Sequence, residues 1–185
     1  LLFRMREQGI SLEDLSGFSS GDLAYQLGFR AEWAESFFQN RDQALRMAEE
    51  LARHSIQIIV NGDEAYPGRL NRTLGDAAPA VLFLRGNPVL LHQKSVAVVG
   101  VRECSGRGSA VAQRCVEQLA AHTINVVSGN AAGIDSVAHQ TALTTGGTTV
   151  FVLAQGILPF HPREAIRPLL QDSNHLILSE FPPRL

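Results

Sequence analysis

The feature that most constrains the fold is a strand–turn–helix pattern that occurs twice in the second half of the chain. In the first copy an apolar run passes directly into Gly100, and in the second a similar run passes into Ser128 and Gly129. Each turn is followed by a segment whose apolar residues have helical spacing. Strands that alternate with helices in this way are typical of a doubly wound α/β fold with a parallel sheet.

The neighbouring segments extend this sheet. The run 95–99 is apolar and uninterrupted, which predicts a strand buried on both faces. The other predicted strands cover 56–60, 81–84, 124–127, 148–153 and 175–178, and the predicted helices cover 109–121, 138–145 and 163–170.

Residues 1–54 have a different pattern, with helical spacing and no strand signal. A turn around Ser20 opens one predicted helix, which stops near Gly28, and the stretch 31–54 is predicted to be helical with a break at 40–42. We therefore predict a small all-helical domain over 1–54 and an α/β domain over 55–185.

Charge limits the ligands that such a chain can bind. The net charge of −2 argues against a broadly basic DNA-binding face. Residues 1–55 carry nine acidic and six basic side chains, whereas residues 56–185 carry nine and ten. Fifteen of the sixteen basic residues are arginines, which bind phosphate with two parallel hydrogen bonds. Any nucleic-acid site is therefore expected to be a local arginine patch.

Several classes of protein are disfavoured. Cys104 and Cys115 form neither a disulfide framework nor a metal quartet, and the histidines lack zinc spacing. No apolar run approaches the ~18 residues of a membrane span, and no signal-peptide pattern opens the chain. We predict a cytoplasmic protein without a metal, a cofactor or a membrane segment.

The first turn is a candidate anion site. It brings backbone N–H groups and the positive end of a helix to one point, and Arg102 and Arg107 are spaced to hold a phosphate. The glycines fit neither the dinucleotide fingerprint nor the P-loop, which argues against ATP hydrolysis. The alternative is an ordinary turn with arginines facing solvent.

Two further turns are expected at the same edge of the sheet. Asp135 and His139 follow the second turn, and we favour a helix cap and a hydrogen-bonded core histidine over an acid/base pair, because no nucleophile or metal partner is evident. Gly156 and Arg163 follow the predicted strand at 148–153. The carboxyl end of that strand lies at the edge where ligands collect in open α/β sheets.

These segments, in this order, resemble the DprA/Smf family of bacterial DNA-processing proteins. The resemblance runs from about residue 56 to 185. The matching positions are Tyr66, Pro67, Gly100, Arg102, Ser105, Gly108, Ser128, Gly129, Ala131, Gly133, Ile134, Asp135, Ala138, His139, Gly156, Pro162, Ser179, Glu180 and Pro182.

The resemblance implies an extended Rossmann-like domain, here incomplete at its C-terminal end, behind a helical domain similar to SAM or helix-hairpin-helix folds. It implies a non-catalytic protein that binds single-stranded DNA in a phosphate-binding pocket and delivers it to the RecA recombinase, often as a homodimer. The DNA-binding residues that it implies, together with those read from the turns, are Gly100, Arg102, Ser105, Arg107, Gly108, Ser128, Gly129, Gly133, Asp135, Gly156 and Arg163.

The sequence also departs from the family pattern. Val101 replaces a serine, and Ala132 replaces a basic residue. The pair Phe160 and His161 stands where a tyrosine is more usual. Three alternatives remain: a sensor of a free nucleotide, a phosphoribohydrolase, and a protein-interaction module in which residues 1–54 bind the partner. The phosphoribohydrolase motif is absent, with only a faint echo at 146–148.

Overall fold

The computed structural model describes residues 5, 7–10 and 14–185. The chain divides into two compact units, Leu1–His54 and Ser55–Leu185. Each unit has a buried apolar cluster made of its own residues. The first unit is built from helices, and the second is built around a β-sheet.

The first unit contains helices that begin and end at the signals in the sequence. Its elements are η1 (Asp14–Gly17), α2 (Ser20–Leu27), α3 (Ala31–Gln39) and α4 (Arg41–Arg53). A capping box opens α2: the N–H of Asp22 donates to Ser19 Oγ, and the N–H of Ser19 donates to the Asp22 carboxylate at 2.8 Å. Gly28 ends α2 in the left-handed conformation, with φ of 62°. The predicted break at 40–42 coincides with the junction of α3 and α4 at Asn40.

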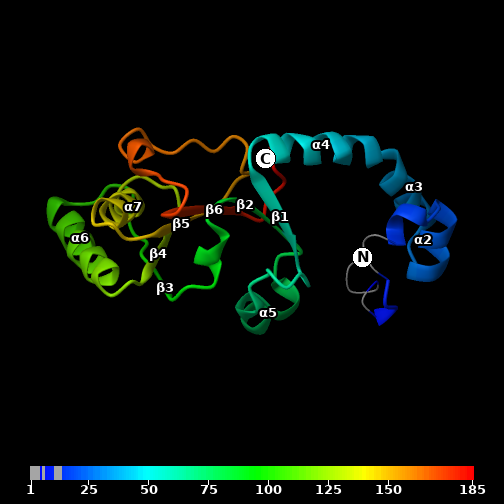
Figure 1. Cartoon of the computed structure of the whole chain (residues 1–185), viewed down its shortest axis with the longest axis horizontal. Coiled ribbons are helices and arrows are strands. Elements are labelled where there is room, and N and C mark those ends of the chain that lie inside the picture. The colour runs from blue at the N-terminus through cyan, green and yellow to red at the C-terminus, as the bar shows by residue number, and fades with distance from the viewer. Residues whose placement is uncertain (1–4, 6, 11–13) are drawn as a thin grey trace. The chain divides into compact units, whose positions relative to one another are not determined.

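The second unit is built on one six-stranded sheet in the order β1-β2-β6-β5-β4-β3 (Figure 1). Strands β3 to β6 are parallel, whereas β1 pairs with β2 and β2 with β6 in antiparallel register. The predicted fold class, a Rossmann-like α/β sheet behind a helical segment, is confirmed. The strands are β1 (Ile56–Val60), β2 (Val81–Gly86), β3 (Ser95–Ala97), β4 (Asn125–Ser128), β5 (Thr149–Leu153) and β6 (His175–Ser179).

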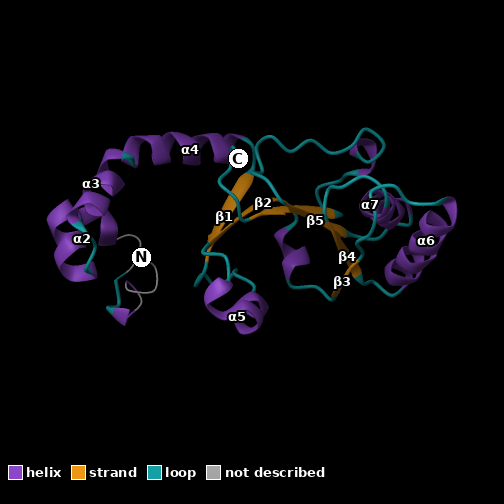
Figure 2. Ribbon diagram, turned by 180° about the vertical axis from the view of Figure 1, so that it is seen from behind, coloured by secondary structure: helices purple, strands orange, loops and turns teal. Residues whose placement is uncertain are grey.

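Two long helices connect the parallel strands and bring their carboxyl ends to one edge. Helix α6 (Gly106–Ala121) joins β3 to β4, and α7 (Ile134–Thr144) joins β4 to β5. They lie side by side (Figure 2), and they share a buried cluster with β4 made of Val116, Val126, Ala138 and Ala142. The shorter elements are α5 (Gly68–Leu74), η2 (Gly75–Ala77), η3 (Pro88–Leu91) and η4 (Arg167–Leu169).

The prediction that residues 95–99 are buried on both faces is wrong. Strand β3 covers only residues 95–97, all of them exposed, and it lies at the end of the sheet. Val96 is 40% exposed and Val99, beyond the strand, is 70% exposed. An apolar run predicts a strand but not its place in the sheet, because that place depends on which other strands pair with it.

The predicted helix at 163–170 is also wrong. Only the short 3-10 helix η4 forms there, with Pro168 in its first turn, and Pro162 precedes the segment. Proline offers no backbone N–H and restricts the residue before it, so two prolines this close prevent a regular helix. By contrast, α6 and α7 begin three or four residues earlier than predicted, which places Gly108 and Asp135 inside the first helical turns.

Among the described residues, no helix combines the length and apolar character needed to cross a membrane.

Candidate functional site

A cavity of about 320 Å³ opens at the carboxyl edge of the parallel strands. It lies where the segments that follow β3, β4 and β5 converge, as expected for an open α/β sheet. Three of the predicted site residues, Arg102, Gly129 and Asp135, line this cavity. The other lining residues were not predicted from the sequence: Asn130, Ala131, Val152, Leu153, Ala154 and Gln155.

The first turn, residues 99–105, presents its side chains mostly to solvent. Arg102 is exposed and lines the cavity, and Val101 beside it is 63% exposed. Gly100 permits close packing on α7, because a Cβ there would lie 2.7 Å from the Ile134 side chain. Arg102 has no assigned partner among the described residues, so the turn contributes a cation to the cavity on a backbone that is packed against α7.

Ser105 and Gly108 belong to the start of α6. Ser105 is the N-cap, and its Oγ accepts a hydrogen bond from the Gly108 N–H at 3.1 Å. Arg107 lies in the first turn of α6 and is exposed. None of these three residues is in the described lining of the cavity, and the hydrogen bond between Ser105 and Gly108 caps the helix.

The second turn, residues 128–133, is held by hydrogen bonds within the protein. The buried Ser128 hydroxyl donates to the Val98 carbonyl at 2.6 Å, which holds the end of β4 against the residue that follows β3. Gly133 has φ of 76°, and a Cβ on it would clash with the carbonyl oxygens of Val101 and Arg102. The Ile134 N–H also donates to the Val101 carbonyl at 3.2 Å. Gly133 therefore allows the two turns to be in backbone contact.

Asp135 does not cap α7 as predicted, because α7 starts earlier. The N-cap is Gly133, and the Asp135 carboxylate lies within the first turn, only 6% exposed. It accepts a hydrogen bond from the Ala131 N–H at 3.3 Å, and a Cβ on Gly129 would lie 2.7 Å from it. An ionised carboxylate offers no donor to a phosphate, so Asp135 shapes the cavity wall and supplies no positive charge.

His139 is a hydrogen-bonded core residue, as predicted. It is 1% exposed, stacks on Phe151 at 3.7 Å between ring centroids, and contacts the Gly129 carbonyl at 2.6 Å and Thr149 Oγ1 at 2.7 Å. Burial lowers its pKa to about 4, although the Gly129 carbonyl and the Asp135 charge act in the opposite direction. The imidazole is therefore neutral at pH 7, and its nitrogens do not face Asp135 as an acid/base pair would require.

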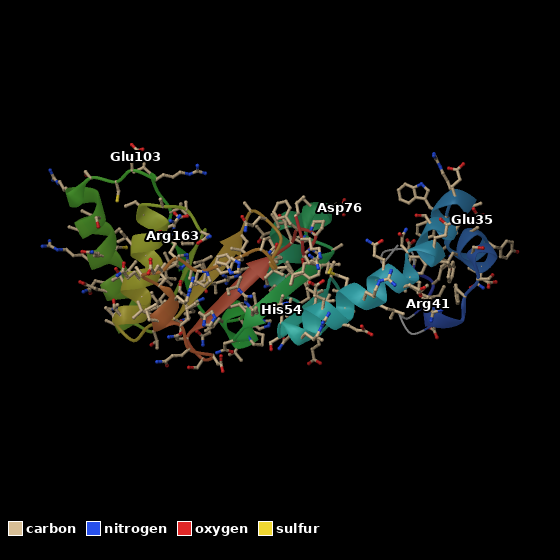
Figure 3. All side chains as sticks on the ribbon, turned by 90° about the horizontal axis from the view of Figure 1, so that it is seen from above. Glu35, Arg41, His54, Asp76, Glu103 and Arg163 are labelled. Atoms are coloured by element: carbon tan, nitrogen blue, oxygen red, sulfur yellow. The ribbon has the colours of Figure 1, made fainter. Side chains whose placement is uncertain are left out.

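The third segment contributes to the site unevenly. Gly156 N–H donates to the Leu185 carbonyl at 2.8 Å, and a Cβ on Gly156 would clash with the carbonyls of Pro182 and Pro183. This glycine therefore serves close packing of the final segment. Arg163 is exposed, and its Nη2 donates to the Asn130 carbonyl at 3.2 Å, beside the cavity but outside its lining. Figure 3 shows Arg163 near the body of the sheet, whereas Glu103 projects outward from the loop before α6.

Asn130 and Gln155 could have been found from the sequence, because each follows a strand of the parallel sheet within two residues. In the part of the chain that the structure describes, no group of three or more histidine, cysteine, aspartate or glutamate side chains is arranged to hold a metal ion.

The chain is similar to known DNA-processing proteins along most of its length. The family model for DNA recombination-mediator protein A matches residues 57–185. The DNA processing protein DprA of Streptococcus pneumoniae is 38% identical over 168 residues, which is 88% of this chain and 56% of that protein. Protein Smf of Escherichia coli is 38% identical over 128 residues, covering 68% of this chain and 33% of that protein. The chain thus spans between a third and about half of these relatives.

Solved structures agree with the sequence comparison. The X-ray structure of DprA from Streptococcus pneumoniae superposes with a TM-score of 0.71 at 32% identity, over 98% of this chain and 62% of that one. A structure of DNA processing protein A from Helicobacter pylori has a TM-score of 0.53 at 24% identity, over 68% of this chain and 55% of that one, and supports the fold. The chain belongs to the DNA recombination-mediator protein A family, together with the DprA and Smf proteins.

Proposed function

We propose that this protein binds single-stranded DNA without cutting or modifying it, with a phosphate of the DNA bound at the cavity on the carboxyl edge of the sheet. The observation that carries the proposal is the placement of Arg102 beside the turn that leads into α7. A guanidinium and the N-terminal end of a helix meet at one cavity there, and both attract an anion. Arg163 lies next to this cavity and could contact a neighbouring phosphate.

The relatives support the ligand class. They are DNA-processing proteins by name, and the Helicobacter pylori protein was described in terms of its single-stranded DNA binding mode. We extend the proposal to delivery of the DNA to a RecA-type recombinase in the cytoplasm, by a protein that acts as a homodimer. Since this chain covers about half of its pneumococcal relative, these roles are proposed for the whole protein.

The arrangement of the cavity favours binding over catalysis. The described lining holds one carboxylate and one guanidinium, and no serine, cysteine or histidine that could act as a nucleophile or base. Of the candidate bases, Asp135 accepts a hydrogen bond from the Ala131 N–H and is 6% exposed, and His139 is buried with both its nitrogens in contact with protein groups.

Fluorescence anisotropy with a labelled oligo-dT tests the proposal directly. We expect wild-type binding to weaken steeply as salt increases, because polymer binding releases several counterions. Arg102→Ala should weaken binding by about tenfold and flatten the slope of log affinity against log salt by about 0.7 to 1, the loss of one phosphate contact.

Arg114→Ala is the matched control. Arg114 is exposed on α6, the helix that follows the first turn, and it does not line the cavity. Because it is also an arginine, its replacement by alanine changes the net charge by the same amount. Equal losses in both variants would contradict a site at Arg102. Competition by thymidine monophosphate as strong as by the oligomer would instead favour a sensor of a free nucleotide.

A further inference from the structure

A chain of buried hydrogen bonds runs beneath the cavity and ends on one of its lining residues. Thr149 Oγ1 lies 3.0 Å from the Val126 carbonyl and 2.7 Å from His139 Nδ1, and His139 Nε2 lies 2.6 Å from the Gly129 carbonyl. Thr149 is fully buried and His139 is nearly so. The chain therefore links the buried sheet interior to the partly exposed Gly129.

The acceptors in this chain determine where the protons lie. A carbonyl oxygen only accepts, so Nε2 of His139 carries the proton that is donated to Gly129. The Thr149 hydroxyl donates to the Val126 carbonyl at 3.0 Å, and its oxygen lies 2.7 Å from Nδ1 of His139. Stacking on Phe151 holds the plane of the ring.

The donated hydrogen bond fixes a peptide group of the cavity. No peptide bond between described residues is cis, and in a trans peptide the C=O and N–H point in opposite directions. The Gly129 carbonyl is turned toward the buried imidazole, so the N–H of Asn130 points away from it. Gly129 and Asn130 both line the cavity, and within the described residues no acceptor is assigned to the Asn130 N–H.

We infer that His139 is a positioning residue, which holds the Gly129–Asn130 peptide so that the Asn130 N–H is presented to an anionic oxygen of the ligand. The inference rests on the proposed function for the identity of that ligand. Gly129 makes such a constraint necessary, because glycine has no Cβ to restrict rotation of the peptide on either side of it. A bulkier residue at 129 is excluded by the Asp135 carboxylate, which lies 2.7 Å from the position of a Cβ.

Three variants separate positioning from simple packing. His139→Phe keeps an aromatic ring against Phe151 but removes the donor to Gly129. His139→Gln places a side-chain N–H near the position of Nε2 and should restore the donor. Val116→Ala removes apolar contacts from the fully buried cluster under α6, away from the cavity, and serves as the control for lost stability.

The first measurement is made on the free protein and does not depend on DNA. We expect the ¹H–¹⁵N signal of Asn130 to shift in His139→Phe, to return toward the wild-type position in His139→Gln and to stay unchanged in Val116→Ala. Titration with inorganic phosphate should move this signal in the wild type and not in His139→Phe. An Asn130 signal in His139→Phe that matches the wild type overturns the inference.

The second measurement is oligo-dT affinity. We expect His139→Phe to weaken binding about tenfold, as loss of one preorganised donor does, while His139→Gln stays within about threefold of the wild type. If Val116→Ala weakens binding as much as His139→Phe, the role of His139 is structural and the inference fails. If wild-type protein does not bind oligo-dT at all, the proposed function fails, whereas the Asn130 signals still decide the positioning role.

Discussion

The two turns beside the cavity come from the same sequence pattern but are stabilised in opposite ways. At the second turn and in α7, which follows it, Ser128, Asp135 and His139 are all buried, and each has a hydrogen-bond partner within the protein. In the first turn Val101 and Arg102 are exposed, and the side-chain bond that the structure assigns there is the Ser105 cap of α6. The second turn is thus fixed before any ligand arrives, whereas the first leaves its arginine available.

One edge of the sheet therefore combines a rigid part and an adaptable part. Buried polar groups hold one geometry because breaking their hydrogen bonds inside the protein is costly. An exposed arginine has no such constraint. The two parts are connected at Gly133, whose backbone touches the first turn from within the second.

The largest test of this connection is Gly133→Ala. The added Cβ would meet the carbonyl oxygens of Val101 and Arg102, and φ is 76°, so we expect a loss of about 4 kcal/mol in the free energy of unfolding. Gly146→Ala is the matched control, since Gly146 also has φ of 76° but faces open space, and it should lose only about 1 kcal/mol. Similar losses would mean that backbone conformation, and not contact between the turns, dominates.

The readout for these unfolding experiments should be circular dichroism in urea. The single tryptophan of the chain, Trp33, lies in the helical first unit, so its fluorescence reports on the wrong part of the molecule.

Acid should lower the free energy of unfolding, because His139, which contacts the second turn, becomes protonated. Its pKa in the folded protein is about 4, below the ordinary value of 6.5, so the unfolded chain binds more protons between these pH values. The stabilisation is present above pH 6.5 and is lost as the pH falls toward 4, by about 3 kcal/mol. Urea unfolding at intervals between pH 7 and 4 measures this loss.

His139→Gln is the comparison for that experiment, because it should lack this part of the pH dependence. Burial also lowers the pKa of His175, but that residue is present in both proteins, so the difference between them isolates His139. Parallel curves for the two proteins would show that protonation of His139 has no effect on stability.

The smallest expected effect is in the adaptable turn. Ser105→Ala removes the side-chain cap of α6 and should lower the free energy of unfolding by about 1 kcal/mol, whereas Ser105→Gly should lose only a few tenths. Circular dichroism in urea again measures the loss. A larger loss in Ser105→Ala than in Gly133→Ala would mean that the first turn, and not the second, contributes more to stability.

The sequence predicted most strands and turns because their signals are local. The β-branched run at 56–60 and the Gly28 helix end depend on neighbours only a few residues away, and both are found as predicted. The predictions that were wrong depend on wider context. Helical spacing at 163–170 did not account for Pro168, and the apolar run at 95–99 could not indicate that β3 lies at the end of the sheet.

The candidate site shows the same difference between what local signals predict and what depends on wider context. Arg102 and Gly129 were predicted from their turns and line the cavity, whereas Ser128, Ser105 and Gly156 have contacts within the protein instead. A turn sequence identifies which residues are near an edge of the sheet. It does not indicate whether a given side chain faces the ligand or the fold, because that depends on the element packed against it.

Local patterns and their order along the chain were sufficient to predict the family, the α/β fold class and the edge of the sheet at which the cavity opens. The packing of the elements against one another determines which groups at that edge have hydrogen-bond partners among the described residues. The contact of His139 with Gly129 spans ten residues and depends on how α7 packs against β5, so no local signal could reveal it. Hydrogen bonds between elements form only when those elements are packed. These bonds distinguish the rigid second turn from the adaptable first turn.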